Sequence, residues 1–539
     1  MIAQIEKHPI LSLFVCTILL LGFSLYFLPV SIMEARNFVS AREMLTDNNW
    51  LLTTFNGEPR YQKPPLPTWI TACFGYLFGY QTVWALRFPA ALMVFVSCLG
   101  TYFISKDIFQ NKNSAFIVAL VTLTSLYIVA IIFEAPWDIY AHGFMILAIY
   151  GFFKILTIKT FLVKYYLLFA ICLTASILSK GPVSIYVLFL PFLISYGIVF
   201  GYKLKFKFIV KLIILIAIGF IAGSSWYIYV RYEDAQSFSK IAIEETTRWK
   251  NYETKPFLYY WNFFTQSGLW TILALTGLIF PYMKRRVENI KSYKLVLCWT
   301  LIAIVFLSLI PTKKTRYVMP VLLPLSLVIG FYMNFQIKNF KNLKSNYHRL
   351  PIYVTFSIIA SVGLAIPFAL YFVAEDYDLK LWILFLVGFA IIYYLSSLIF
   401  KFLKHKKLKL SFYAVVALYT SFGILLVPFS KPLIKENFET IQELNNPEFE
   451  LYYLGYATPE QIFYNGDKIP NILKNIENIT KGKKEVFVFT QNSDLNTIEK
   501  IKAHFEVSLY KIYDFNSDEI NASGYNTRLH QKLYKLSPK

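Results

Sequence analysis

The sequence has little charge and little cysteine for its length. Charged residues make up 16% of the 539 residues, whereas a soluble domain typically carries about 25%. The five cysteines include no CxxC pair. Because free cysteine behaves as a small apolar side chain, we interpret these residues as part of a hydrophobic interior. The low charge argues against a chain built of several soluble domains.

The signatures of several common enzyme classes are also missing. The chain has no P-loop, no GxGxxG turn and no serine-centred hydrolase elbow. Its six histidines are scattered, without HxxH or HExxH spacing. These absences argue against a nucleotide-dependent reaction, so the energy for any group transfer must come with the substrate.

Long hydrophobic runs dominate the first 430 positions. Hydrophobic residues are 56% of the chain and aromatic residues 18%, and the runs are close to the ~20 residues that cross a bilayer as a helix. We predict about thirteen transmembrane helices, at residues 10–30, 84–106, 114–134, 137–156, 164–180, 182–201, 208–230, 262–282, 293–310, 317–336, 351–374, 380–400 and 410–428. The first has no small-residue cleavage site behind it, so we expect a retained span rather than a signal peptide.

The basic residues alternate between the connecting loops, and this alternation orients the spans. By the positive-inside rule the basic loops are cytoplasmic, and they include Lys106, Lys112, Lys154, Lys164, Lys205, Lys207, Arg285, Arg286, Lys338, Arg349, Lys404 and Lys406. The long loops 31–83 and 231–261 then lie outside, as does the C-terminus after an odd number of spans. The net charge of +21 is therefore a topology signal, and no nucleic-acid partner is expected.

Residues 430–539 differ in character, because charge rises and the long apolar runs stop. Strands are expected at "FELYYLGYA", "EVFVFTQ", "VSLYKIYDF" and "HQKLYKL", and a helix at "LNTIEKIKAHF". We predict two domains: an all-α polytopic membrane domain over 1–429, carrying the two long outer loops, and a small α/β domain over 430–539 on the outer face.

The first outer loop holds a dense set of ionisable residues. Glu34 directly follows the first span, and Arg36 and Arg42 share the helical spacing of "ARNFVSAREML", which predicts an interfacial helix. Lys63 lies in "YQKPPLPTW", which cannot be a regular helix because each proline biases the preceding residue away from that conformation. The alternative is an ordinary surface loop with a salt bridge.

A second carboxylate set lies between the third and fourth spans, in "FEAPWDIYAH". Glu134 and Asp138 are ionisable residues at or near membrane depth, where they are costly and functional by default. A solvated turn is the alternative. Asp138 also begins a helix, where a carboxylate is favourable for the helix dipole alone.

Several basic residues lie on the outer side, against the positive-inside trend. Lys180 is in "SKGPVS", and Lys313, Lys314 and Arg316 are in "PTKKTRYVMP". An anionic ligand is one reason for such placement, since Lys and Arg hold phosphate well. The alternative is a few tolerated outward charges. The loop 231–261 places Glu245 and Arg248 on a short helix whose mixed charge is typical of a solvated face.

Taken together, the motifs resemble a known family. They are "EARNFVSAREML", "NGEPRYQKPPLPTW", "WALRFPAAL", "DIYAHGFMILAIYGF", "SKGPVS", "PFLYYW" and "TKKTRYVMPVLLPLSLVIG". The chain is similar to GT-C glycosyltransferases of the protein O-mannosyltransferase superfamily, glycosyltransferase family 39, and within it to bacterial lipid A aminoarabinose transferases. The motifs cover residues 1–335, and the architecture extends to the C-terminus.

The resemblance implies a GT-C fold and an inverting transfer of a sugar from a polyprenyl phosphate, such as undecaprenyl phosphate. The acceptor would lie on the periplasmic side of the bacterial inner membrane, with the C-terminal domain in the periplasm. It implies catalytic roles for Glu34, Lys63 and Asp138. With the charge pattern, it implies substrate-binding roles for Arg36, Arg42, Tyr61, Lys180, Glu245, Arg248, Lys313, Arg316 and Tyr317. A monomer without a cofactor is expected.

The chain departs from the family pattern at a few positions. Met33 stands where the family has the Asp of an Asp-Glu pair, so the acidic role is carried to Glu34, and Asn37 replaces a Tyr. Gln62 replaces a Glu, and Glu245 or Thr246 replaces a His. In aminoarabinose transferases those last two positions resemble a metal site. Glutamine is a poor metal ligand, and a metal is not predicted.

The expected chemistry follows from the donor. The transition state is oxocarbenium-like, and the phosphate leaves with growing negative charge. Lys63, Arg316 and either Lys180 or Lys313 would neutralise that charge. Glu34 would orient or deprotonate the acceptor, and Asp138 would position the acceptor or hold Lys63.

Three alternatives stay open at this point. The acceptor is expected to be lipid A or a related glycolipid, with a protein Ser or Thr as the alternative. A flippase for lipid-linked sugars is the rival from another class, but no internal repeat is found and the unusual charges gather at one surface. A plain membrane anchor would not need basic residues on the outer side.

Overall fold

The computed structural model describes most of the chain and divides it into two compact units. Described are residues 2–426 apart from 159, 203–204, 252, 344 and 374–378, and then residues 450–474, 485–491, 502, 505–514, 516 and 525–539. The first unit comprises Met1–Leu25, Gln62–Pro67 and Arg87–Pro428. The second comprises Tyr26–Tyr61, Thr68–Leu86 and Phe429–Lys539.

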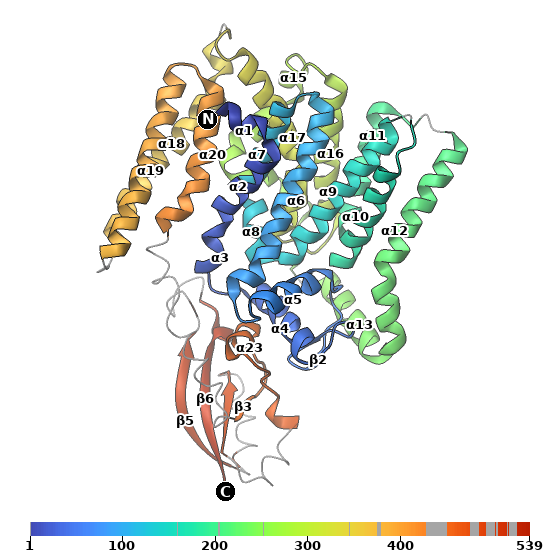
Figure 1. Cartoon of the computed structure of the whole chain (residues 1–539). Coiled ribbons are helices and arrows are strands. Elements are labelled where there is room, and N and C mark those ends of the chain that lie inside the picture. Colours follow the sequence, from blue (N-terminus) through green and yellow to red (C-terminus); the bar gives the residue numbers. More distant parts are fainter. Residues whose placement is uncertain are drawn as a thin grey trace. The chain divides into compact units, whose positions relative to one another are not determined.

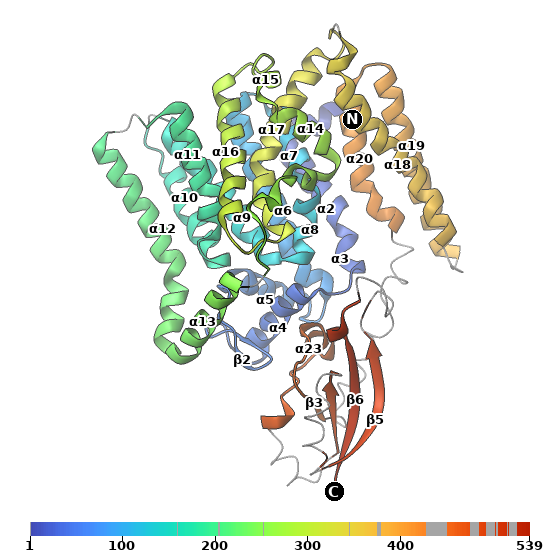
Figure 2. The ribbon, with the colours of Figure 1, turned by 180° about the vertical axis from the view of Figure 1, so that it is seen from behind.

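The first unit is a helical bundle (Figures 1 and 2). Its N-terminal half contains α1 (Ile2–Lys7), α2 (Pro9–Gly22), α6 (Val83–Phe109), α7 (Lys112–Leu123), α8 (Leu126–Glu134), α9 (Pro136–Thr157), α10 (Val163–Lys180), η1 (Ile185–Phe189), α11 (Leu190–Phe200), α12 (Phe206–Glu233) and α13 (Ala235–Asn251). Its second half contains η2 (Phe257–Tyr260), η3 (Phe263–Trp270), α14 (Thr271–Leu278), α15 (Phe280–Met283), α16 (Ile290–Leu309), η4 (Thr315–Val318), α17 (Met319–Asn339), α18 (Leu350–Val373), α19 (Leu379–Lys404) and α20 (Leu408–Leu426).

Most of the predicted spans are long single helices. Among the described residues, nine helices are long and apolar enough to cross a membrane, and the bent pair α7–α8 makes ten if counted as one span. The other predicted spans match helices that are shorter or broken, at α2, at η1 with α11, and from η3 to α15. The multi-pass, all-α fold class is confirmed, whereas the count of thirteen stays a prediction.

The basic connections lie at one end of this bundle. In Figures 1 and 2, α15 and the start of α12 lie at the upper end, while α13 lies at the lower end. Arg285 and Arg286 follow α15, and Lys205 precedes α12. This is the separation that the alternation of basic loops predicts.

Small residues bring α9, α10 and α12 close together, which matters because α9 and α10 carry two of the predicted site residues. A Cβ at Gly223 of α12 would lie 2.6 Å from Cβ of Ile177 on α10. Ser176 of α10 donates to the backbone oxygen of Ala141 on α9 over 2.7 Å. Close backbone approach of this kind is the usual means of association between membrane helices.

The second unit combines the first long loop with the C-terminal segment. From the loop come α4 (Ile32–Thr46), the hairpin β1 (Thr54–Phe55) and β2 (Glu58–Pro59), and most of α5 (Leu66–Phe78). From the C-terminal segment come β3 (Glu450–Tyr453), α23 (Pro459–Asn465), β4 (Val486–Thr490), β5 (Phe505–Asp514) and β6 (His530–Pro538). The sheet order is β3-β4-β6-β5, with β3 and β4 parallel and β6 antiparallel to both its neighbours.

The four predicted strands are confirmed, and the predicted helix "LNTIEKIKAHF" lies almost wholly outside the described residues. One apolar core joins the loop to the C-terminal segment: Phe38 of α4 packs against Phe463 of α23, with ring centres 5.5 Å apart. The compact unit therefore crosses the predicted boundary at residue 429, which itself stays a prediction.

Candidate functional site

In the first unit, Asp138 and Lys180 form a buried ion pair. Nζ of Lys180 contacts Oδ1 of Asp138, and the two side chains are 13% and 3% exposed. An ion pair buried inside a helical bundle costs desolvation that a surface pair does not. The sequence predicted both residues as part of the site, but not that they pair with each other.

The ends of two helices create this pair. Pro136 stands at the first position of α9 and Asp138 is in its first turn, while Lys180 is the last residue of α10. Proline is preorganised for a helix start, and Gly181, with a φ of 69°, ends α10. The carboxylate thus lies at the positive end of one helix dipole and the ammonium at the negative end of the other, which favours both charges.

Tyr317 and Arg316 lie next to the pair. Nζ of Lys180 is 5.3 Å from the centre of the Tyr317 ring, and the Arg316 guanidinium is 6.0 Å from the same ring. Nη1 of Arg316 also reaches the backbone oxygen of Glu134, 3.5 Å away. The structure therefore brings together four of the predicted site residues: one carboxylate, two cations and a tyrosine.

A hydrogen bond between His142 and Ser184, which the sequence did not reveal, is also formed by α9. His142, one turn after Asp138 on α9, is 3% exposed, and its Nδ1 lies 2.9 Å from Oγ of Ser184. Ser184 directly precedes η1, so the contact fastens α9 to the segment that follows α10. A lone histidine and a lone serine carry no spacing signal, which is why neither was a candidate.

Lys313 has different surroundings, although the sequence placed it with Lys180. It is 3% exposed, and its Nζ donates to the backbone oxygens of Ile310, at 2.6 Å, and Lys255, at 3.0 Å. Burial lowers the pKa of Lys313. Its ammonium thus ties the end of the long loop 231–261 to the turn before α17. The neighbouring Lys314 pairs with Glu253 at 3.3 Å.

Glu245 and Arg248 form a short-range pair on α13. Arg248 Nη1 and Glu245 Oε1 are 3.1 Å apart, three residues apart in the helix, and the arginine side chain is 60% exposed. The predicted helix is confirmed by α13. A pair this exposed contributes little to the stability of the protein. A substrate-binding role for Glu245 and Arg248 stays a prediction.

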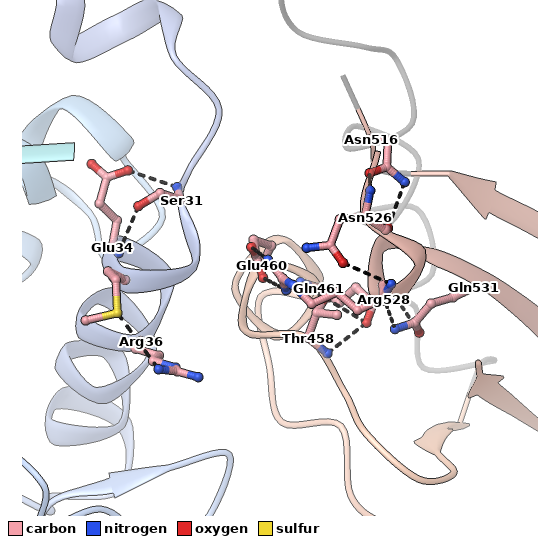
Figure 3. A network of polar contacts seen from close by, with 11 residues as sticks. Ser31, Glu34, Arg36, Thr458, Glu460, Gln461, Asn516, Asn526, Arg528 and Gln531 are labelled. Carbon is pink, nitrogen blue, oxygen red and sulfur yellow. Dashed lines mark hydrogen bonds and ion pairs between the residues drawn. The ribbon is translucent and has the colours of Figure 1, made fainter. Parts of the chain in front are cut away.

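In the second unit, Glu34 is part of a capping box. Its Oε2 accepts a hydrogen bond from the backbone nitrogen of Ser31 at 2.9 Å, while Oγ of Ser31 accepts from the Glu34 nitrogen. Figure 3 shows this reciprocal pair at the start of α4, with Arg36 directed toward the sulfur of Met33. Glu34 is 1% exposed. A catalytic candidate thus has a structural role as well.

The arginines of this unit are held by backbone oxygens. Nη1 of Arg42 donates to Ile462 at 3.1 Å, and Nη1 of Arg60 donates to Arg36 at 2.6 Å. Burial lowers the pKa of Arg42 and of Arg60, and the nearby charge of Arg36 adds to the effect on Arg60. Tyr61 is buried next to Arg60 in the chain. The sequence did not mark Arg60, since no pattern signals a buried arginine.

Lys63 lies in the segment Gln62–Pro67, which belongs to the first unit. Residues 61–65 contain no helix, as the prolines predicted. The prediction is wrong for the last four residues of "YQKPPLPTW", because α5 begins at Leu66 and a proline is tolerated in the first turn of a helix. The predicted site residues are therefore divided between the units, with Glu34, Arg36, Arg42 and Tyr61 in the second.

The residues present do not fit a metal ion. Among the described residues, no three His, Cys, Asp or Glu side chains gather as ligands could. Gln62, at one of the two positions that the resemblance associates with a metal, offers one neutral amide oxygen, whereas hard divalent cations prefer several carboxylate oxygens.

Comparison with known proteins gives relatives over much of the chain. A family model described as dolichyl-phosphate-mannose-protein mannosyltransferase matches residues 62–229. A protein of Aquifex aeolicus (strain VF5), described as uncharacterized, is 26% identical over 379 residues, which cover 67% of this chain and 72% of that protein. The undecaprenyl phosphate-alpha-4-amino-4-deoxy-L-arabinose arabinosyl transferase of Erwinia tasmaniensis is 24% identical over 348 residues.

The match to the Erwinia enzyme covers 62% of this chain and 61% of that enzyme, so the chain spans less than two thirds of its length. A solved structure matches more completely. The crystal structure of ArnT from Cupriavidus metallidurans bound to undecaprenyl phosphate has a TM-score of 0.71 at 15% identity and covers 97% of this chain and 96% of that chain. The chain therefore has the GT-C fold, and the likeness to aminoarabinose transferases read from the motifs is confirmed.

Proposed function

We propose that this chain, which has the GT-C fold of the aminoarabinose transferases, is a membrane glycosyltransferase. It transfers a sugar from a polyprenyl-phosphate donor to lipid A or a related glycolipid. The donor class is supported by the names of the relatives, which act on undecaprenyl phosphate sugars. The chain would act at the outer face of the bacterial inner membrane, with its C-terminal part in the periplasm.

The observation that carries this proposal is the buried pair of Asp138 and Lys180 beside Tyr317 and Arg316. A membrane bundle keeps such charges only where they are paired or serve a ligand. Two cations next to one tyrosine ring suit the phosphodiester of the donor, whose single negative charge grows toward two as the bond to the sugar breaks. The Asp138 carboxylate holds the lysine in place before the donor arrives.

In the proposed reaction, an oxygen of the acceptor attacks the anomeric carbon of the donor sugar. The bond from that carbon to the phosphate oxygen breaks, and its electron pair leaves with the polyprenyl phosphate. One displacement inverts the anomeric centre. Lys180 and Arg316 stabilise the growing charge on the leaving phosphate, an electrostatic contribution worth about 10²–10³ in kcat per donor group.

Whether the reaction needs a general base depends on the chemical class of the acceptor. A phosphate acceptor is already ionised at neutral pH and needs no proton removed, whereas a sugar hydroxyl must lose one. A carboxylate near its ordinary pKa of about 4 is a weak base for a hydroxyl. Orientation of the acceptor is therefore the role that we propose for Glu34, at the start of α4, among those that the resemblance implies.

The test is transfer by the purified full-length chain in proteoliposomes. These contain lipid A and either undecaprenyl phosphate-linked 4-amino-4-deoxy-L-arabinose or undecaprenyl phosphate alone. Mass spectrometry of the extracted lipid should show addition of one sugar, and the Asp138→Asn and Lys180→Met variants should show far less. Sugar movement across the bilayer without any covalent product would instead indicate a flippase.

A protein acceptor is the second candidate, and the match of residues 62–229 to the protein mannosyltransferase family favours it. The same proteoliposomes supplied with unfolded periplasmic proteins decide between the two. Glycopeptides in place of modified lipid A would move the acceptor from lipid to protein while leaving the donor class unchanged.

A further inference from the structure

The turn of the β1–β2 hairpin is held from one side by Glu43 of α4. This carboxylate is 1% exposed. Its Oε1 accepts from the backbone nitrogen of Asn56 at 2.6 Å, and its Oε2 accepts from Oγ1 of Thr54 at 2.5 Å and the nitrogen of Gly57 at 3.3 Å. Hydrogen bonds to an ionised, buried carboxylate are strong. The three bonds to Glu43 therefore hold the hairpin firmly against α4.

From the other side, the Asn56 side chain binds the C-terminal segment. Its Nδ2 donates to the oxygen of Ile469 at 2.7 Å, and its Oδ1 accepts from the nitrogen of Ile469 at 2.8 Å. Asn56 and Gly57 have φ values of 57° and 76°, which an Asn-Gly turn supplies at low cost. The amide thus pairs with one residue of the C-terminal segment in both directions, as a strand neighbour would.

Three further contacts join the same loop to the same segment. The hydroxyl of Tyr464 accepts from the nitrogen of Val30 at 3.0 Å, just before α4. Arg42 donates to Ile462 at 3.1 Å, and Lys468 pairs with Asp47, at the end of α4, at 2.6 Å. The contacts therefore hold α4 at its entry, near its middle and at its end.

We infer that residues 462–469 of the C-terminal segment are a positioning element for the first outer loop, and that Asn56 is a positioning residue for sugar transfer. The inference rests on the proposed function, because α4 carries Glu34 and the chain reaches Lys63 four residues after β2 ends at Pro59. Reacting groups must be held within about 0.5 Å of their productive geometry. The Asn56 amide is the contact that fixes the turn between them.

The experiment replaces Asn56 by glycine in the full-length chain. Glycine adopts the same positive φ without strain, so the variant loses the side-chain contacts to Ile469 and little else. Asn48→Gly is the matched control, since Asn48 is in the same loop, is exposed and has a φ of 60°. Displacement of a reacting group by 1 Å costs about 10²-fold. We expect Asn56→Gly to lower kcat about tenfold or more by the same effect, with the donor KM nearly unchanged.

Hydrogen–deuterium exchange of residues 31–61 provides a readout that needs no substrate. Faster exchange there in Asn56→Gly, but not in Asn48→Gly, together with the fall in kcat, supports the inference. Unchanged exchange, or an unchanged kcat, overturns it. If the wild-type chain transfers no sugar at all, the proposed function fails, and exchange alone decides whether residues 462–469 order the loop.

Tyr464→Phe is a second variant that keeps the packing of α23. It removes the hydroxyl that accepts from Val30 and should produce a smaller change of the same kind. If Asn56→Gly does not fold, Asn56→Asp replaces it, because aspartate tolerates the positive φ. It keeps an acceptor for the Ile469 nitrogen but places a second acceptor oxygen against the Ile469 carbonyl, where Asn56 has a donor. Wild-type kcat in both Tyr464→Phe and Asn56→Asp would overturn the positioning role.

Discussion

Lys180 and Lys313 are alike in the sequence and different in the structure. Both belong to short turns that the charge pattern predicts on the outer side, where basic residues are unexpected. Lys180 pairs with the Asp138 carboxylate beside Tyr317. Lys313 donates to the backbone oxygens of Lys255 and Ile310. Lys180, whose partner is a carboxylate, is therefore suited to bind an anionic substrate. Lys313, whose partners are backbone oxygens, holds two segments together.

The two lysines differ in how easily each can leave its partner to bind a phosphate. An ion pair can rearrange around an incoming phosphate, because the phosphate replaces the charge that the carboxylate supplied. A lysine bound to backbone oxygens cannot turn toward a ligand without leaving those oxygens unsatisfied in a buried place, which costs about 1–3 kcal/mol for each. Charge placement alone does not make this distinction.

The largest effect is expected for Lys180→Met. Loss of the cation should lower kcat by about 10²–10³-fold, measured as single-turnover sugar transfer in proteoliposomes. The variant also leaves Asp138 buried without its cation, which typically destabilises by about 3–5 kcal/mol. Thermal unfolding in detergent should recover in the Asp138→Asn/Lys180→Met double variant while activity stays low. Wild-type turnover in that double variant would remove the pair from the reaction.

The variant Glu34→Gln separates two roles of Glu34: the proposed action on the acceptor and the capping box at the start of α4. Glutamine keeps the capping-box geometry at this position, so the free energy of unfolding should change little. If the charge acts on the acceptor, kcat should fall by about 10²-fold. Glu34→Ala removes both roles and should add about 1 kcal/mol of destabilisation. Full activity in Glu34→Gln would leave the residue with capping alone.

Lys313→Met is expected to have the reverse profile of Lys180→Met. Two backbone oxygens lose their donor, so stability should fall by about 2–6 kcal/mol, seen as a lower Tm in detergent. The kcat of the folded fraction should stay within about threefold of wild type, because no charge facing the substrate is lost. A large fall in kcat without a change in Tm would return Lys313 to the substrate-binding set.

The smallest effect is expected for Arg248→Ala on α13. The exposed pair with Glu245 should contribute about 0.3–0.5 kcal/mol at most, so thermal unfolding should be nearly unchanged. If Arg248 binds a substrate, as the resemblance implies, the KM of the donor or of the acceptor should rise severalfold with kcat unchanged. An unchanged KM would remove both residues of this pair from the proposed site.

Local patterns predicted much of the fold and part of the candidate site. The spacing of "ARNFVSAREML" predicted α4. The prolines of "YQKPPLPTW" predicted the absence of helix correctly for residues 61–65 only, because α5 begins at Leu66. The four C-terminal strands followed from short apolar runs. In each case the cause is local, because a helix or strand depends on residues a few positions apart.

The contacts between distant segments were not predictable in this way. Ser184 is 42 positions from His142, and Ile469 is 413 positions from Asn56. Neither contact has a spacing signal, because single polar residues are compatible with many partners. The packing of the C-terminal segment against the first loop was therefore missed, although each part was recognised.

The sequence by itself determined the multi-pass, all-α fold class, which residues of the predicted outer loops are ionisable, and which family the chain resembles. Hydrophobic length and loop charge suffice for the first two, since each acts along the chain. Only the tertiary structure decided that Asp138 pairs with Lys180, that Lys313 binds backbone oxygens, and that Asn56 binds Ile469. These depend on distances of about 3 Å between side chains brought together by packing, and hydrogen bonds and ion pairs form only at that range.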